Sequence, residues 1–109
     1  MNSTDNNVTI EWAPFEVAGH VSDKQLEKAA VELEVNFLKK QDGYLRRELL
    51  KGEGKQWVDL VYWSSPQAAA KAAEDANSSE AFLEYFSLMV GLDDAEDGIA
   101  HYRQVKTWN

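Results

Sequence analysis

Four segments of the chain have the hydrophobic pattern of β-strands: hydrophobic and polar residues alternate with a period of two or, in residues 56–63, are almost wholly apolar. Such alternation is typical of β-strands, because successive side chains of a strand point to opposite faces of the sheet. It predicts strands over residues 8–16, 44–51, 56–63 and 99–108. The Gly-Glu-Gly-Lys sequence of residues 52–55 predicts a hairpin turn between the second and third strands. Pro14 lacks a backbone N–H, so we expect the first strand to bend, or its ladder to stop, there.

Between these strands, apolar residues recur every three or four positions, which predicts helices. Ser22 and Gln25 have the spacing of a capping box, and the helix that they begin is expected to run to about Lys40. The apolar stripe of this helix consists of Leu26, Ala30, Leu33 and Phe37.

The second helical region is expected in two pieces. Ser64 or Ser65 caps the first piece, Pro66 lies in its first turn, and the helix covers residues 67–76. A short helix over residues 81–89 follows. The order strand, helix, strand, strand, helix, strand is typical of an α+β, ferredoxin-like βαββαβ fold with a four-stranded antiparallel sheet and both helical regions on one face. We expect a single domain over residues 8–109, preceded by a disordered lead-in over residues 1–7.

Residues 56–63 form the most informative of these strands. Odd positions place Trp57, Asp59, Val61 and Trp63 on one face of the sheet, and even positions place Val58, Leu60 and Tyr62 on the other. Neither row is polar enough to face water, so both faces are expected to be covered. The helices suffice for one face only. A second copy of the chain is the simplest cover for the other, so we expect a homodimer whose two sheets close into an α/β barrel.

Composition narrows the classes of partner. The 109-residue chain carries a formal net charge of −8 and no cysteine. This charge argues against nucleic acid and against anionic membrane surfaces as partners, because both require clustered cations. The polar N-terminal residues lack a signal sequence, so the cytoplasm is the expected location. No metal-binding motif is found, and no metal or cofactor is expected.

Four stretches together resemble a known family. They are residues 43–50, residues 57–65, residues 82–89 and His101 in the last strand. They resemble the dimeric α/β-barrel superfamily, and within it the antibiotic biosynthesis monooxygenase-like proteins, over residues 8–108. The resemblance implies a homodimer with one pocket per subunit between helices and sheet. Reactions in this superfamily range from cofactor-free quinone-forming oxygenation to heme degradation and decarboxylation.

The resemblance also bears on individual residues. Trp63 matches a tryptophan that ends the third strand and lines the pocket of several oxygenases in the family. Heme-degrading members carry a ligand histidine in the helix before the last strand, where this chain has Phe86. Heme degradation is therefore disfavoured. The candidate ligand pocket comprises Trp63, Phe86, Trp57, Trp12 and Tyr85.

Two titratable residues are candidates for catalysis. Asp59, on a covered face, can act as a general base or orient a substrate hydroxyl. It can instead pair with Arg47 or another basic residue of the neighbouring strand and hold the sheet together. His101 can act as a proton shuttle, or it can simply bond to Glu11 or Tyr85 at a strand end.

The expected function is that of a cofactor-independent, monooxygenase-like enzyme acting on a small aromatic or polyketide-like molecule. Two alternatives stay open. One is a non-catalytic homodimer that binds a small molecule. The other is a structural homodimer whose pocket is filled by its own side chains.

Overall fold

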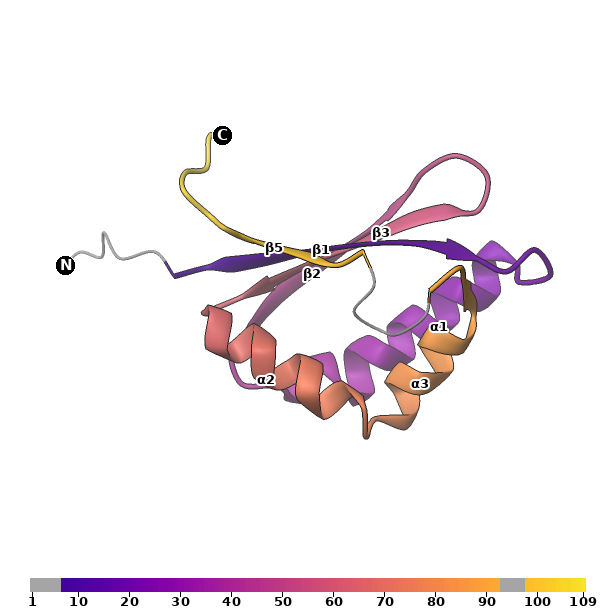
Figure 1. Cartoon of the computed structure of the whole chain (residues 1–109), viewed down its shortest axis with the longest axis horizontal. Coiled ribbons are helices and arrows are strands. Elements are labelled where there is room, and N and C mark those ends of the chain that lie inside the picture. Colours follow the sequence, from indigo (N-terminus) through magenta and orange to yellow (C-terminus); the bar gives the residue numbers. More distant parts are fainter. Residues whose placement is uncertain (1–6, 93–97) are drawn as a thin grey trace.

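A computed structural model describes residues 7–92 and 98–109 of the chain as one sheet with helices packed on one face (Figure 1). The strands are β1 (Thr9–Val17), β2 (Tyr44–Lys51), β3 (Gln56–Trp63), β4 (Met89–Val90) and β5 (Ala100–Arg103). The helices are α1 (Asp23–Asn36), the short 3₁₀ helix η1 (Leu38–Lys40), α2 (Pro66–Ala76) and α3 (Glu80–Ser87). Apart from Asn7, the lead-in predicted for residues 1–7 lies outside the described residues.

The sheet has the predicted antiparallel, ferredoxin-like arrangement. Strand β3 lies between β2 and β1, and the far edge of β1 pairs with both β5 and β4. Residues 9–12 of β1 pair with β5, and residues 16–17 pair with β4. Pro14 lies between these two stretches, where its missing N–H interrupts no ladder on this edge. The predicted stop in the ladder is therefore present on one edge only, because β1 pairs with β3 throughout.

The last strand is shorter than predicted, and β4 was not predicted at all. Strand β5 ends at Arg103, which pairs with Thr9, and the N–H of Gln104 donates one further hydrogen bond to the carbonyl of Val8. Beyond that point the chain leaves the sheet, with its C-terminal end on the side opposite the helices (Figure 1). A strand to Trp108 would need a partner from residues before Val8.

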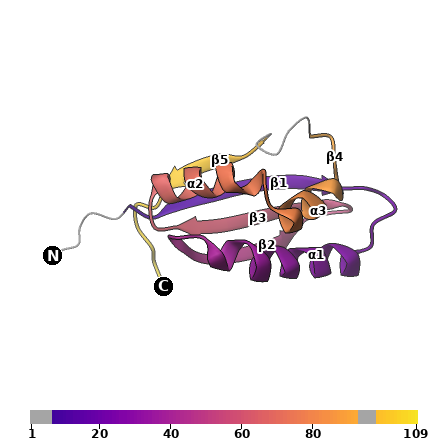
Figure 2. The ribbon, with the colours of Figure 1, turned by 90° about the horizontal axis from the view of Figure 1, so that it is seen from below.

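Local signals set the helix starts as expected, but two helix ends differ from the prediction. Helix α1 ends at Asn36, and residues 38–40, expected in the same helix, form η1; α3 ends at Ser87, and Met89, expected in that helix, belongs to β4. The side chain of Ser22 accepts a hydrogen bond from the N–H of Gln25, and the Gln25 side chain accepts one from the N–H of Ser22. The apolar stripe of α1 is buried, with Leu26 fully so. Ser65 caps α2, and Pro66 is its first residue. Viewed from the helical side, α1 runs along the β2 side of the sheet and α2 along the β5 side (Figure 2).

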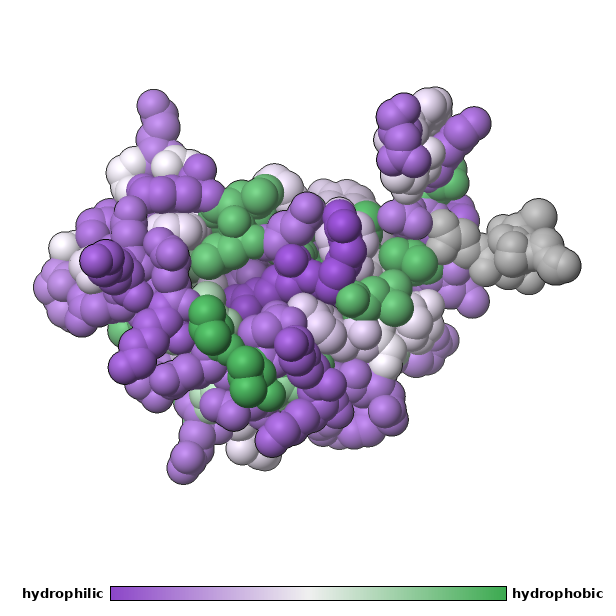
Figure 3. Space-filling model, turned by 180° about the vertical axis from the view of Figure 1, so that it is seen from behind, coloured by the Kyte–Doolittle hydropathy of each residue, from purple (hydrophilic) through white to green (hydrophobic). Residues whose placement is uncertain are grey.

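Burial on β3 follows the predicted alternation. The odd positions, from Trp57 to Trp63, are buried on the helix-covered side, whereas Val58, Leu60 and Tyr62 are only half-buried and Gln56 is exposed. Here we call the helix-covered side the inner face and the opposite side the outer face. Within the single chain, no described element covers the outer face, where Trp12, Leu50 and Tyr102 are exposed. Seen from behind the view of Figure 1, hydrophobic residues form several separate patches among hydrophilic ones (Figure 3).

An irregularity in β2 changes which side chains reach the interior. The pairing of β2 with β3 shifts between Tyr44 and Arg46, so that Leu45 has no partner on β3. A bulge of this kind inserts one residue and reverses the alternation on one side of it. Strict alternation predicts Tyr44 and Arg47 on opposite faces. Because of the bulge, both point inward.

Candidate functional site

A cavity of about 210 Å³ lies between the inner face of the sheet and the helices. One water molecule needs only about 15 Å³ by such a measure, so the space is large enough for a small organic molecule. Its walls are mainly apolar. The sheet contributes Ala13, Phe15, Val61 and Trp63, and the helices contribute Leu33, Phe37, Ala72, Ala76, Phe82, Tyr85 and Phe86. The open volume beside Trp63 counts against a structural dimer that fills its own pocket.

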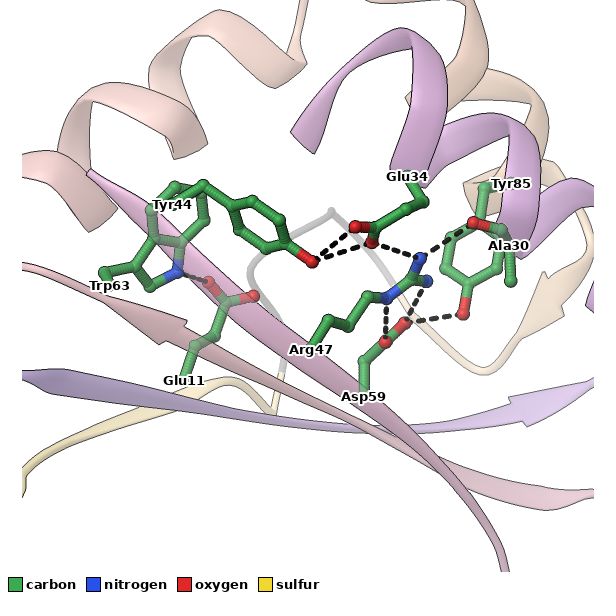
Figure 4. A network of polar contacts seen from close by, with 8 residues as sticks. All are labelled: Glu11, Ala30, Glu34, Tyr44, Arg47, Asp59, Trp63 and Tyr85. Carbon is green, nitrogen blue, oxygen red and sulfur yellow. Dashed lines mark hydrogen bonds and ion pairs between the residues drawn. The ribbon is translucent and has the colours of Figure 1, made fainter. Parts of the chain in front are cut away.

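Four polar side chains reach the cavity, and they form two groups. One group is Asp59 with Arg47; the other is Glu11 with His101. The aromatic rings of Tyr85 and Trp63 adjoin the first and the second group respectively (Figure 4).

Both carboxylate oxygens of Asp59 are bound. The guanidinium of Arg47 donates from Nε to Oδ1 at 2.6 Å and from its second terminal nitrogen to Oδ2 at 3.0 Å. The hydroxyl of Tyr85 donates to Oδ2 at 2.5 Å. This geometry matches the structural alternative for Asp59, a pair with Arg47 across neighbouring strands. A carboxylate that already accepts three hydrogen bonds is poorly placed to take a proton from a ligand.

Arg47 continues this network toward α1. Its first terminal nitrogen donates to the carbonyl of Ala30 at 2.7 Å and lies 3.6 Å from Oε1 of Glu34. Burial lowers the pKa of the Arg47 guanidinium, but the hydrogen bonds and charge of Asp59 outweigh this effect and raise it. The hydroxyl of Tyr44 donates to the Glu34 carboxylate at 2.7–2.8 Å. Arg47 thus carries a permanent charge and ties α1 to the sheet.

Glu11 is held far more loosely. It lies on β1 opposite Val61, and the indole N–H of Trp63 donates to its Oε1 at 3.2 Å. Within residues 7–92 and 98–109, its other oxygen accepts no hydrogen bond, and Figure 4 draws none. Burial raises the pKa of the Glu11 carboxyl, and the Trp63 hydrogen bond and the charge of His101 lower it to a lesser degree. A largely buried carboxylate that has a raised pKa, and one oxygen without a partner among the described residues, has the properties of a proton acceptor.

His101 lies beside Glu11 on the adjacent strand. The two residues are direct partners in the β1–β5 ladder, and Nε2 of His101 is 3.9 Å from Oε1 of Glu11. The His101 side chain is 45% exposed, whereas that of Glu11 is 20% exposed. His101 therefore connects the buried carboxylate with solvent. The sequence suggested Glu11 or Tyr85 as a partner of His101, and the structure places Glu11 within ion-pair distance.

The aromatic residues of the predicted pocket divide into two sets. Trp63, Tyr85 and Phe86 line the cavity. Trp57 does not, because it lies farther along β3, where it is buried and Nζ of Lys51 lies 5.2 Å from its ring centroid. Trp12 pairs with Leu60, an even position of β3, and is therefore on the outer face. The expectation that Trp12 and Trp57 line the pocket is corrected by these positions.

Glu11 was named from the sequence only as a partner of His101, and its place in the cavity was missed. The regular row of Val8, Ile10 and Trp12 draws attention to the other face of β1. The signal for Glu11 is its parity with Phe15 and Val17, both of which are buried. That signal becomes specific only when the register of β1 against β3 is known.

Other kinds of site are not found in the described part of the chain. No group of three or more His, Cys, Asp or Glu residues there is placed to hold a metal ion. None of its helices has both the length and the apolar character needed to cross a bilayer.

The chain has the same fold as several solved structures, among them a cofactor-independent oxygenase and proteins named as antibiotic biosynthesis monooxygenases. SnoaB, a cofactor-independent oxygenase from Streptomyces nogalater, superposes with a TM-score of 0.68 at 17% identity and covers 93% of this chain and 96% of its own. A protein from Bordetella bronchiseptica, assigned by name to the antibiotic biosynthesis monooxygenases, superposes with a TM-score of 0.68 at 13% identity and covers 92% of this chain and 99% of its own. A conserved protein from Methanosarcina mazei superposes with a TM-score of 0.66 at 17% identity, over 93% of this chain and 96% of its own. No protein-family model and no curated protein matches the sequence. At these identities the likeness concerns the fold alone.

Proposed function

We propose that the protein is a cofactor-independent oxygenase that acts on a small, electron-rich hydroxyarene or polyketide-like molecule. The observation that carries this proposal is the apolar cavity in which an under-bonded carboxylate, Glu11, lies beside the indole of Trp63. The fold is shared with SnoaB, which is described as a cofactor-independent oxygenase.

The chemistry needs a proton acceptor and a dry site. Glu11 takes a proton from the ligand, and His101 passes it to solvent. The resulting electron-rich anion reacts with dissolved dioxygen, which is the oxidant. For an activated CH₂ group, one oxygen atom enters a new C=O bond and the other leaves as water with the two hydrogens, so atoms and electrons balance without a cofactor.

Asp59 has a different role in this proposal. Its bonds to Arg47 and Tyr85 set the position of Tyr85 in the cavity wall. The catalytic role predicted for Asp59 is thus replaced by a positioning role. His101 keeps its predicted role as a proton shuttle.

We also propose that two chains associate through the outer face. Apolar side chains of four strands gather on this face: Ile10 and Trp12, Leu50, Val58, Leu60 and Tyr62, and Ala100 and Tyr102. The same face carries the Arg46–Glu48 ion pair beside these apolar residues. An exposed apolar surface of this kind is usually covered in solution. Light scattering is expected to give about twice the chain mass of 12.3 kDa. A monomer at micromolar concentration would count against this arrangement.

Oxygen uptake tests the enzymatic proposal. Chelator-treated protein, without added flavin or heme, is mixed with a panel of hydroxyarenes and anthrone-like compounds in an oxygen electrode. At least one compound should consume one dioxygen per molecule converted, with a quinone absorbance appearing in parallel. Ligands that bind without any uptake would instead establish the alternative, a non-catalytic binding protein.

A further inference from the structure

We propose that the cavity selects uncharged aromatic ligands that donate a hydroxyl proton to Glu11, and that it rejects aromatic carboxylates. This inference rests on the proposed function, because it names the ligand class of the same cavity. It follows from three features of the wall: a cation that is already used, a carboxylate that is not, and an excess of negative charge.

The cation that is already used is Arg47. It is the one permanent cation among the described residues that line the cavity. Each of its three guanidinium nitrogens faces a carboxylate or a carbonyl of the protein, and its side chain is only 7% exposed. A carboxylate ligand would have to displace Asp59 or Glu34 to obtain a bidentate contact. The usual means of binding an organic acid is therefore already taken by the protein.

The carboxylate that is not used is Glu11. Its Oε1 accepts the indole N–H of Trp63, and its other oxygen has no partner among the described residues. Carboxylates accept hydrogen bonds and, when ionised, cannot donate them. The group that best completes this site is an O–H donor carried on a flat apolar body. Phe82 and Phe86, whose rings stack at a centroid distance of 6.1 Å, supply apolar wall for such a body.

The charged side chains in and near the cavity wall carry an excess of negative charge. Glu11, Asp59 and Glu34 contribute three carboxylates, against the permanent charge of Arg47 and the titratable His101. An anionic ligand would bring a further negative charge into a poorly solvated space. Like charges at contact distance disfavour binding by at least about tenfold, even when the surroundings are as polarisable as a protein surface.

The first test compares three ligands of nearly the same shape. Naphthol is an uncharged donor at neutral pH, its methyl ether cannot donate, and naphthoate is an anion. Isothermal titration calorimetry on the wild-type dimer should rank naphthol about tenfold or more above the ether, as expected for a hydrogen bond to a charged acceptor. Naphthoate should bind at least about tenfold more weakly than naphthol.

The second test assigns this preference to one residue. Glu11→Gln keeps the size of the side chain and removes its charge, so naphthoate should gain at least about tenfold relative to naphthol. Glu16→Gln is the matched control, because Glu16 lies on the same strand but is exposed and does not line the cavity. Its ligand ranking should equal that of the wild type.

The outcomes separate this inference from the proposed function. Equal binding of naphthol and naphthoate by the wild type, or an unchanged ranking in Glu11→Gln, would overturn the inference and leave an oxygenase possible. The expected ranking without oxygen uptake by any hydroxyarene would sustain the inference and overturn the enzymatic proposal. If none of the three compounds binds, the cavity is not an aromatic site and both fail.

Discussion

Asp59 and Glu11 are two inward-facing carboxylates on neighbouring strands, and they differ in how their oxygens are used. Asp59 accepts three hydrogen bonds from Arg47 and Tyr85. From the residues that the structure describes, Glu11 accepts one, from Trp63. The first carboxylate is bound so completely that its function is to hold the fold. The second has one oxygen that accepts no hydrogen bond from the described residues, and it lines the cavity. Burial alone therefore does not identify a reactive carboxylate; the number of partners does.

The largest expected effect is on the bound pair. Arg47→Met should lower the free energy of unfolding by about 3–5 kcal/mol, because it leaves Asp59 buried without its cation. Urea denaturation measures this loss. Lys71→Met is the control, since Lys71 is exposed on α2, away from both sheet faces, and its ion pair with Asp75 lies at the surface. Equal losses of unfolding free energy in the two variants would contradict the claim that the Arg47–Asp59 pair stabilises the fold.

Next in size is the effect of Glu11→Gln on turnover. Loss of a general base typically slows a reaction by at least about 100-fold, and we expect this fall in the rate of oxygen uptake. The free energy of unfolding should not decrease, because Glu11 gives up only one hydrogen bond acceptor and an unfavourably buried charge. A variant that keeps the wild-type rate would remove Glu11 from the mechanism.

A smaller effect is expected from a substitution on the outer face, which we predict to change self-association but not ligand binding. Trp12→Ala should weaken self-association by about 30-fold, the size expected for a central aromatic residue of an interface, and leave naphthol affinity nearly unchanged. Light scattering over a dilution series and calorimetry provide the two readouts. Val31→Ala, at an exposed position of α1, is the control for both. If Trp12→Ala abolished ligand binding while the dimer persisted, Trp12 would belong to the pocket after all.

The smallest effect is a pH dependence of stability. Burial raises the pKa of Glu11 above its ordinary value of 4.5, so the folded protein holds this proton more tightly than the unfolded chain does. The resulting contribution to stability is present below about pH 4.5 and is lost as the pH rises through the raised pKa. The charged groups that act on Glu11, namely His101, Arg47 and Asp59, are the same in the wild type and in Glu11→Gln, so the difference between these two proteins reports on Glu11.

Urea midpoints of the wild type and Glu11→Gln measure this dependence. The variant should gain stability relative to the wild type as the pH increases toward neutrality. A constant difference at every pH would mean that Glu11 titrates normally.

Much of this comparison was accessible from local sequence patterns. The alternation of β3 placed Asp59 on a covered face, and adjacency of strands suggested Arg47 as its partner. Caps at Ser22 and Ser65 fixed the helix starts. These features depend on residues close in sequence or on a single strand pairing, so they could be predicted from the sequence pattern.

The other features of the site depend on the register between strands, which cannot be predicted from the hydrophobic pattern. The bulge at Leu45 turns Tyr44 inward, and nothing in the residues 44–51 signals it. Glu11 becomes a cavity residue, and Trp12 an outer-face residue, only through the pairing of β1 with β3. The small strand β4 arises where Pro14 divides an edge between two short partners.

The most direct test of the account measures oxygen uptake by Asp59→Asn and Glu11→Gln side by side, with the best hydroxyarene of the panel and below the unfolding transition of each variant. We expect Asp59→Asn to unfold at lower urea concentration yet keep most of the wild-type rate. Glu11→Gln should retain its stability and lose at least about 100-fold in rate. The opposite pattern, an inactive but stable Asp59→Asn beside a fully active Glu11→Gln, would contradict the division of roles between the two carboxylates.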